Sequence, residues 1–244
     1  STLIVNDVDP IIATLVAFLT GALAGLLTGF LMTKAKIPGL LAGILVMTGL
    51  YSINLVVMGK SNIALLNYPR ITNLFSGWLG LPNDYSTILV AILLISLIIL
   101  FLVFFFQSDL GQALIATGDN ERMARSLGIK TDEMKMIGLA LSNGLIGLSG
   151  ALIGQYNGYV DISMGIGIFV IGLAAIIIVE IFYKNLSLTE RFISIPIGAI
   201  FYRFIIALAL YIGLPPDLMK LVSAGILGLF LSLPNIIEER RAAE

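Results

Sequence analysis

The sequence contains neither cysteine nor histidine among its 244 residues. Without them the chain cannot form a disulfide bond, a Cys/His zinc site, a histidine-ligated haem site or a Ser-His-Asp catalytic triad. The acidic residues are scattered along the chain and form no cluster typical of an active site. We therefore predict no catalytic residue, no metal site and no cofactor, and we do not expect an enzyme.

Charge is also scarce. Only 12% of the residues are charged and the net charge is −1, whereas 58% are hydrophobic and the mean hydropathy is +1.03. These values lie outside the range of soluble domains and indicate an integral membrane protein surrounded by lipid. The near-neutral net charge provides no basic surface for nucleic acid, so no nucleic-acid partner is expected.

Seven apolar stretches approach or exceed the roughly 20 helical residues that a hydrocarbon core of about 30 Å requires. These stretches are residues 10–33, 38–58, 86–106, 134–153, 165–183, 192–212 and 219–237. A shorter segment, 71–81, is expected to be an interfacial or partly re-entrant helix, because it is too short to span and contains Trp78. The sequence thus predicts an all-α, polytopic helix bundle, with 1–244 as a single transmembrane domain.

Lysine and arginine concentrate in alternate loops, which predicts the orientation in the membrane. If the charged loop, about residues 107–135, is cytoplasmic, most basic residues fall inside: Lys34, Lys36, Arg122, Arg125, Lys130, Lys135, Lys184, Arg191, Arg240 and Arg241. Only Lys60, Arg70 and Lys220 fall outside. With seven spans the N-terminus is then outside and the C-terminus is cytoplasmic.

Glycines recur at the four-residue spacing that lets membrane helices approach closely. They form three ridges, namely Gly21, Gly25 and Gly29; Gly39 and Gly43; and Gly150, Gly154 and Gly158. We interpret these ridges as helix-packing surfaces of the bundle.

The charged loop contains the stretch ATGDNERMARSLGIKTDEMKM, which predicts a short helix, a break and a second helix. Either Asp119 or Asn120 can cap a helix over 121–127, because a short acceptor side chain satisfies free amides of the first turn. Gly128 can end that helix in the left-handed conformation. Thr131 is expected to cap the next helix, which continues into a membrane span.

The short helix carries an apolar pair and charges of both signs. Met123 and Leu127 are one turn apart on the same face, and Arg122 and Arg125 are also close to one turn apart. Such a surface suits docking into a groove of another protein. The alternative is a solvated connection between two spans.

Two stretches carry a family resemblance. ATGDNERMARSLGI and ALSNGLIGLSGALIGQYNGYVDISMGIGIFVIGLAAIII resemble the permease subunit of ATP-binding-cassette (ABC) importers. The pattern G-D-N-E-x-x-A-R-x-x-G-I is similar to the superfamily that takes up branched-chain amino acids, ribose-type sugars and nucleosides. The pattern Q-Y-N-G-Y-x-D-x-x-M-G-I-G resembles a branch often assigned to tryptophan or tyrosine uptake.

The resemblance implies a coupling helix that docks into a cytosolic ATPase. Its motif positions are Gly118, Asp119, Asn120, Glu121, Ala124, Arg125 and Gly128. The docking surface described above adds Arg122, Met123 and Leu127 to the predicted ATPase-coupling residues. The implied partners are cytosolic ABC ATPase subunits, a second permease subunit in a homodimer, and an extracellular or periplasmic solute-binding protein. The implied location is the bacterial cytoplasmic membrane. The family has one or two further helices before the first span here, so we expect an N-terminal portion to be missing.

Polar residues within or beside the spans are candidates for the substrate pathway, because such groups are costly in lipid. They are Asn54, Ser142, Asn143, Gln155, Tyr156, Asn157, Asp161 and Arg203. For Ser142 and Asn143, hydrogen bonds to a neighbouring helix are the simpler interpretation. Arg203 could face a solute carboxylate, or it could pair with Glu180, a carbonyl or a lipid headgroup. Glu180 could instead pair with Lys184.

The favoured function is a non-catalytic translocation subunit for a small polar solute, an amino acid and possibly an aromatic one. The sequence has no G-x-x-x-x-G-K-[ST] motif, so ATP hydrolysis is expected in a separate subunit. One alternative is an ion-coupled secondary carrier, which needs carboxylates near the membrane midplane. Another, within ABC importers, is a sugar or nucleoside permease.

Overall fold

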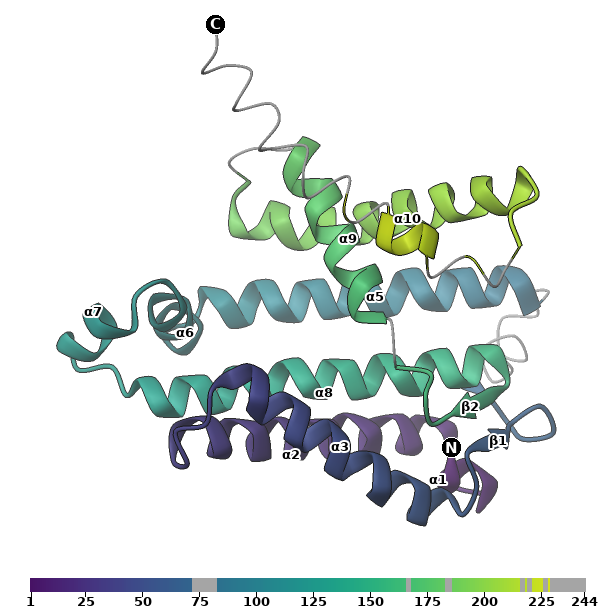
Figure 1. Ribbon diagram of the computed structural model, residues 1–244, viewed down its shortest axis with the longest axis horizontal. Helices are drawn as coiled ribbons and strands as arrows, with labels where there is room; N and C mark the ends of the chain where they lie inside the picture. The colour runs from purple at the N-terminus through teal and green to yellow at the C-terminus, as the bar shows by residue number, and fades with distance from the viewer. Residues whose placement is uncertain are drawn as a thin grey trace, which may run out of the picture. The chain divides into compact units, whose positions relative to one another are not determined.

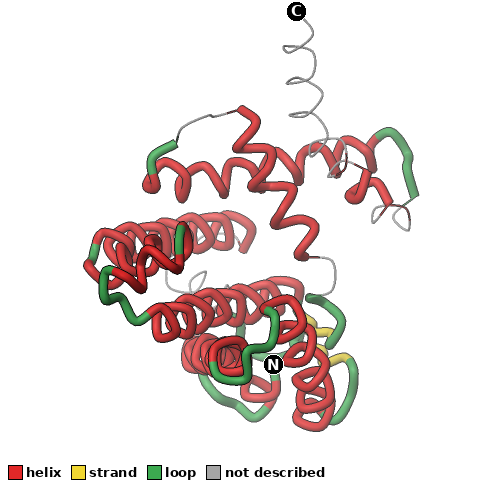
Figure 2. Tube along the Cα trace, turned by 60° about the vertical axis from the view of Figure 1, so that its left-hand side comes forward, coloured by secondary structure: helices red, strands yellow, loops and turns green. Residues whose placement is uncertain are grey.

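A computed structural model of the chain describes residues 1–71, 83–165, 168–182, 186–215, 218, 221–225 and 228. The described residues divide into two compact units, Ser1–Ile162 and Ser163–Glu244, and each is described here by itself. Helices dominate both units, and the strands are confined to one small ribbon (Figure 2). The helical fold class predicted from the sequence is therefore confirmed.

The first unit contains α1, α2, α3, α5, α6, α7 and α8 and the strands β1 and β2 (Figure 1). The helices are Thr2–Val5, Pro10–Thr33, Gly39–Met58, Asn83–Gln107, Asp109–Asp119, Glu121–Ser126 and Thr131–Asn157. The strands are Asn62–Ala64 and Tyr159–Asp161. Neither the strands nor the separate helix α6 is predicted from the sequence.

Helix α2 packs along α8, and glycine makes the close approach possible. A Cβ on Gly25 would collide with the carbonyl oxygen of Leu139, and one on Gly21 would collide with that of Asn143. From the other side, a Cβ on Gly147 would collide with the carbonyl oxygen of Ala17. The first glycine ridge is thus confirmed as a packing surface in which backbone meets backbone.

The two helices run in opposite directions. Thr14, near the start of α2, contacts Gln155, near the end of α8, and Gly29 lies beside Met136, near the start of α8. Consequently the α2–α3 turn and helices α6 and α7 lie at one end of this unit, and β1 and β2 lie at the other (Figure 1). The basic residues of the charged loop and of the α2–α3 turn therefore share an end, as the orientation argument requires.

The ribbon of β1 and β2 closes the end opposite α7. The strands pair antiparallel, with Ile63 opposite Val160. Leu65 donates its amide to the Gly158 carbonyl at 2.7 Å, and its side chain joins a small core with Ile4 and Ala13. This pairing joins the segment that follows α3 to the segment that follows α8.

The second unit contains α9, Ile168–Phe182, packed against α10, Leu188–Tyr211. Ser187 and Glu190 form a capping box at the start of α10. Ala174, Ile178 and Tyr202 make its buried core. Helix α10 contains Pro196.

Five helices of the described chain are long and apolar enough to cross a membrane: Pro10–Thr33, Gly39–Met58, Tyr85–Gln107, Thr131–Asn157 and Leu188–Tyr211. They match five of the predicted spans. For the predicted span at 165–183, α9 covers 15 residues, Ile168–Phe182. The predicted span at 219–237 and the interfacial segment at 71–81 lie largely outside the described residues, so a count of seven is not confirmed.

Candidate functional site

The charged loop folds into two successive helices at one end of the first unit (Figure 1). Helix α6 ends with Gly118 and Asp119, and the chain turns at Asn120, whose φ of −153° is extended. The Asn120 side-chain oxygen accepts the Met123 amide at 3.0 Å and so caps α7. Of the two predicted caps the structure selects Asn120, whereas Asp119 belongs to the last turn of α6.

Helix α7 ends as the sequence predicts. Leu127 is its C-cap, and Gly128 follows with a φ of +86°, in the left-handed region that favours glycine. The Ile129 amide then returns to the Ala124 carbonyl at 3.1 Å. Only Ile129 and Lys130 separate Gly128 from the start of α8.

The predicted cap at Thr131 is wrong. Helix α8 already includes Thr131, its N-cap is Lys130, and no side chain caps it. The Thr131 hydroxyl instead accepts hydrogen bonds from Arg125, from Nε at 3.2 Å and from Nη2 at 2.9 Å. An interaction with a more distant arginine has replaced the local cap. Asp132 and Glu133 lie in the first turn of α8, where the helix dipole favours negative charge.

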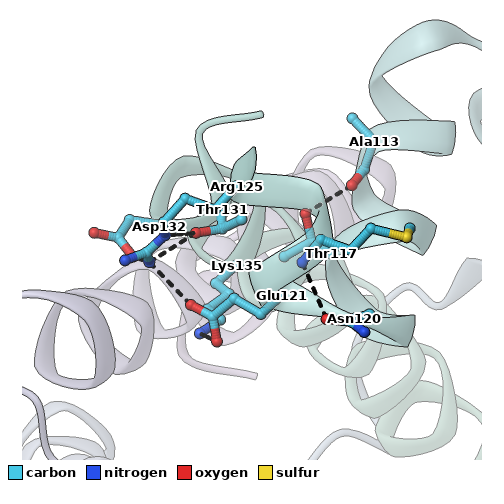
Figure 3. A network of polar contacts seen from close by, with 9 residues as sticks. Ala113, Thr117, Asn120, Glu121, Arg125, Thr131, Asp132 and Lys135 are labelled. Carbon is cyan, nitrogen blue, oxygen red and sulfur yellow. Dashed lines mark hydrogen bonds and ion pairs between the residues drawn. The ribbon is translucent and has the colours of Figure 1, made fainter. Parts of the chain in front are cut away.

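A network of charges joins α7 to α8 (Figure 3). Arg125 Nη2 lies 3.0 Å from Glu121 Oε1 within α7 and 3.4 Å from Asp132 Oδ1 in α8. The second Glu121 oxygen lies 2.6 Å from Lys135 Nζ. Exposed ion pairs add little stability individually. Several linked pairs, however, fix the orientation of the short helix on the long one.

The Lys135 hydrogen bond holds the pKa of Glu121 below its ordinary value of 4.5, and the charges of Lys135 and Arg125 add to the effect. A lowered pKa means that the folded state favours the ionised carboxylate. The contribution of Glu121 to stability is therefore fully present above pH 4.5 and is lost as the pH falls below it.

We expect this loss to be measurable by thermal unfolding of the purified protein. Glu121→Gln should unfold at a lower temperature than the wild type near neutral pH, and the difference should shrink as the pH falls through the lowered pKa. A Ser126→Ala variant, changed on the same helix outside the ion network, is the control. A wild-type advantage over Glu121→Gln that persists unchanged in acid would contradict the role of the ionised carboxylate.

The opposite face of α7 is exposed and apolar. Within α7, Ala124 is completely buried, whereas 48% of Met123 and 70% of Leu127 is exposed. Arg122 is exposed beside them. The sequence correctly predicts an apolar pair bordered by charge. The structure adds that Arg125 and Glu121 participate in the attachment to α8.

The other feature of this unit is an apolar groove between α5 and α8, with a volume of about 620 Å³. Residues 87–98 of α5 and 145–156 of α8 line it, so it lies in the half of the unit away from α7. Tyr156 borders it, as does the buried Gln155. Thr87 and Ser149 are among the lining residues, and the wall of the groove is almost entirely hydrocarbon.

Among the predicted pathway residues, Gln155 and Tyr156 meet at this groove, and Asn157 and Asp161 follow just beyond it. Both ends of the Gln155 side-chain amide are hydrogen-bonded: the oxygen accepts the Ile71 amide at 3.1 Å, and the nitrogen donates to Thr14 Oγ1 at 2.9 Å. Gln155 therefore joins Ile71 and Thr14 to the C-terminal end of α8.

The other predicted residues lie elsewhere. Asn54 is exposed on α3. Ser142 and Asn143 both donate to the Leu139 carbonyl of their own helix, at 3.2 and 2.9 Å, so the expected bonds to a neighbouring helix are not the ones they make. A carbonyl one turn back in the same helix is within reach of both side chains.

Arg203 is exposed on α10, in the second unit. Of the alternatives for Arg203, the pairing with Glu180 is not the one that Glu180 makes. The Glu180 carboxylate oxygen Oε1 instead lies 4.0 Å from Arg191 Nη2. Lys184, the other predicted partner of Glu180, lies outside the described residues.

Two contacts of this unit, those of Lys135 and Arg70, have no signal in the sequence. Lys135 is far from Glu121 along the chain, so no helical spacing signals their contact. Arg70 is visible in the sequence only as a basic residue of an outer loop, yet the structure places its guanidinium against Gly158, at the C-terminus of α8. Long-range contacts of this kind leave no periodic pattern.

Comparison with known proteins identifies the family of the chain. The family model for the permease component of branched-chain amino acid transport systems matches residues 1–231. The chain is 41% identical over 231 residues to a tyrosine transport system permease protein of Clostridioides difficile, covering 95% of this chain and 75% of that protein. It is 36% identical over 233 residues to an uncharacterized protein of Rickettsia prowazekii, covering 93% and 79%.

A more distant relative is the autoinducer 2 import system permease protein LsrC of Yersinia pestis, 27% identical over 174 residues, covering 67% of this chain and 45% of that protein. No solved structure matches the chain. The extent of the family match and the identity to the first relative together establish the membership. The chain belongs to the family of permease components of branched-chain amino acid transport systems, and it is a membrane transport protein of the ABC type.

Proposed function

We propose that the chain is the translocation subunit of an ABC importer whose ATPase is a separate cytosolic protein docking on α7. The exposed pair Met123 and Leu127 would enter a groove of the ATPase, as apolar residues on an amphipathic helix commonly do. The charged loop and the C-terminus would face the cytoplasm. The distribution of basic residues supports this orientation.

The observation that carries the proposal is the continuity of α8. Its 27 residues span about 40 Å in an ideal helix. The ion network attaches α7 to its first turn, and the α5–α8 groove lies along its last three turns. Movement of a docked α7 would therefore be carried by one helix to the groove. A two-state arrangement of helices biased in this way is the basis of alternating access.

We further propose an amino acid, possibly aromatic, as the solute. The family description and the name of the Clostridioides difficile relative support this choice. Two copies of the chain would form the pathway in the lipid bilayer, with residues 1–244 acting as one domain. An extracellular or periplasmic binding protein would deliver the solute to the β1–β2 end. The ion-coupled carrier loses support because the chain belongs to a permease family.

The test is affinity purification of the tagged full-length protein from mildly solubilised membranes, followed by mass spectrometry. We expect a nucleotide-binding ATPase with the wild type and its loss from Met123→Asp/Leu127→Asp, because two buried carboxylates would oppose docking. The control Met123→Leu/Leu127→Met conserves apolar volume and should retain the ATPase. Absence of an ATPase from the wild type, or equal recovery with the aspartate variant, would contradict the proposal.

A further inference from the structure

Helix α7 carries one charge that does not take part in its attachment to α8. Of its three charged residues, Glu121 and Arg125 belong to the ion network (Figure 3). Arg122 is exposed, and its guanidinium forms no hydrogen bond or ion pair with any residue that the structure describes. The charge that α7 presents to a partner is therefore positive.

The place of Arg122 within α7 has no local explanation. Arg122 is the second residue of the helix, in the first turn, where the helix dipole favours negative charge and disfavours a cation. The nearby Asp119 is also exposed, but it directly precedes the cap Asn120, so its charge suits that end of α7. Arg122 thus breaks a local preference without a compensating contact among the described residues, and such departures are expected at functional sites.

Arg122 borders the exposed apolar pair of α7. Residues four apart are neighbours on a helix surface, so Arg122 lies beside Ser126, and Met123 lies beside Leu127. All four side chains are exposed, whereas Ala124 is buried. The free face of α7 therefore combines an apolar ridge with a single guanidinium at its edge. Arginine beside apolar residues is typical of the surfaces that proteins use to bind one another.

We propose that the ATPase groove that receives Met123 and Leu127 has a carboxylate at its rim, and that this carboxylate pairs with Arg122. This deepens the proposed function and rests on it. A guanidinium binds a carboxylate through two parallel hydrogen bonds in a fixed geometry. The apolar pair contributes the buried area of the contact. The pair at the rim speeds the encounter and fixes the orientation, because complementary charges act mainly on association rate and specificity.

An acidic membrane lipid would also offer an anion to Arg122. Attraction to an anionic membrane surface, however, is typical of clusters of about four to eight basic residues. Residues 116–136 carry balanced charge, with four acidic and four basic residues: Asp119, Glu121, Asp132 and Glu133 against Arg122, Arg125, Lys130 and Lys135. A single placed carboxylate on a protein therefore matches Arg122 better than a charged membrane surface does.

The experiment measures association of the purified ATPase with the tagged permease in phosphatidylcholine nanodiscs, by surface plasmon resonance. The ATPase is the protein that the affinity purification recovers with the wild type. At about 0.1 M salt, Arg122→Glu should slow association at least about 10-fold. The difference should shrink at about 1 M salt, because the Debye length falls from about 10 to 3 Å. Glutamate suits the first turn of α7, so this variant should fold as well as the wild type.

Further variants test whether the effect is specific to the position. Arg122→Gln and Lys130→Gln each remove one positive charge, but only Arg122→Gln should slow association, because Lys130 pairs locally with Glu133 at 3.0 Å. Arg122→Lys keeps the charge and should retain most of the association rate. A carbodiimide joins an amine to a carboxylate without a spacer, and it should link Arg122→Lys at residue 122 to an aspartate or glutamate of the ATPase.

Equal association of the wild type and Arg122→Glu would overturn the proposal. Faster association of Arg122→Glu would do so too, because it would mean that a cation faces residue 122. An effect of Arg122→Gln that appears in phosphatidylglycerol nanodiscs and not in phosphatidylcholine would assign Arg122 to lipid. If Met123→Asp/Leu127→Asp loses the ATPase and Arg122→Glu does not, this inference alone fails. Absence of ATPase binding to the wild type refutes the proposed function itself.

Discussion

Replacing Arg125 with alanine is expected to separate docking from transport. The side chain holds α7 to α8 through Thr131 and Asp132, whereas the exposed apolar pair on the opposite face stays intact. The ATPase should therefore remain bound while its closure no longer moves α8. Coupling energies between sites are typically worth about 5- to 150-fold, and we expect ATP-driven uptake to fall within that range.

The measurement is uptake of labelled amino acid by cells that produce equal amounts of each variant, together with recovery of the ATPase. Lys130→Ala is the matched control, because Lys130 pairs only locally with Glu133, at 3.0 Å on the surface, and such pairs contribute little. Unchanged uptake by Arg125→Ala, or loss of the ATPase from it, would show that the network does not transmit motion.

The second large effect is expected at the α2–α8 contact. Gly25→Val should destabilise the protein by at least about 2 kcal/mol, because the new side chain must push α2 away from a rigid backbone. The atom it meets is the Leu139 carbonyl oxygen, which cannot rotate aside. The same displacement would move α8, so transport should be impaired as well.

Thermal unfolding of the purified protein in detergent measures this effect. Gly49→Val is the control, since a Cβ on Gly49 has nothing within 4 Å in this chain. Equal unfolding temperatures for the two variants would contradict the packing argument.

The sequence predicts the local features of the site well. Asn120 and Gly128 delimit α7 because a cap and a left-handed glycine act within a few residues of the chain. The exposed pair Met123 and Leu127 follows from helical spacing alone. The first glycine ridge is also predicted from its spacing. Its partner helix cannot be predicted, because a pattern of small residues does not identify the surface against which it packs.

What the sequence could not predict depends on distant residues. The Thr131 cap fails because Arg125 takes its hydroxyl, and the Lys135 contact with Glu121 requires α7 to fold back on α8. The β1–β2 ribbon pairs two loops far apart in the chain, each too short to show strand periodicity. Ile71 is brought to the groove by its amide hydrogen bond to Gln155, another contact between residues that are distant in the sequence.

One experiment tests directly whether the ATPase contacts α7, at the end of α8 opposite the groove. The chain has no cysteine, so Met123→Cys provides a unique attachment point for a benzophenone cross-linker in the assembled transporter. We predict a cross-link from residue 123 to the ATPase and none from the matched variant Tyr156→Cys. A cross-link to the ATPase from Tyr156→Cys, or none from Met123→Cys in a transporter that retains its ATPase, would contradict it.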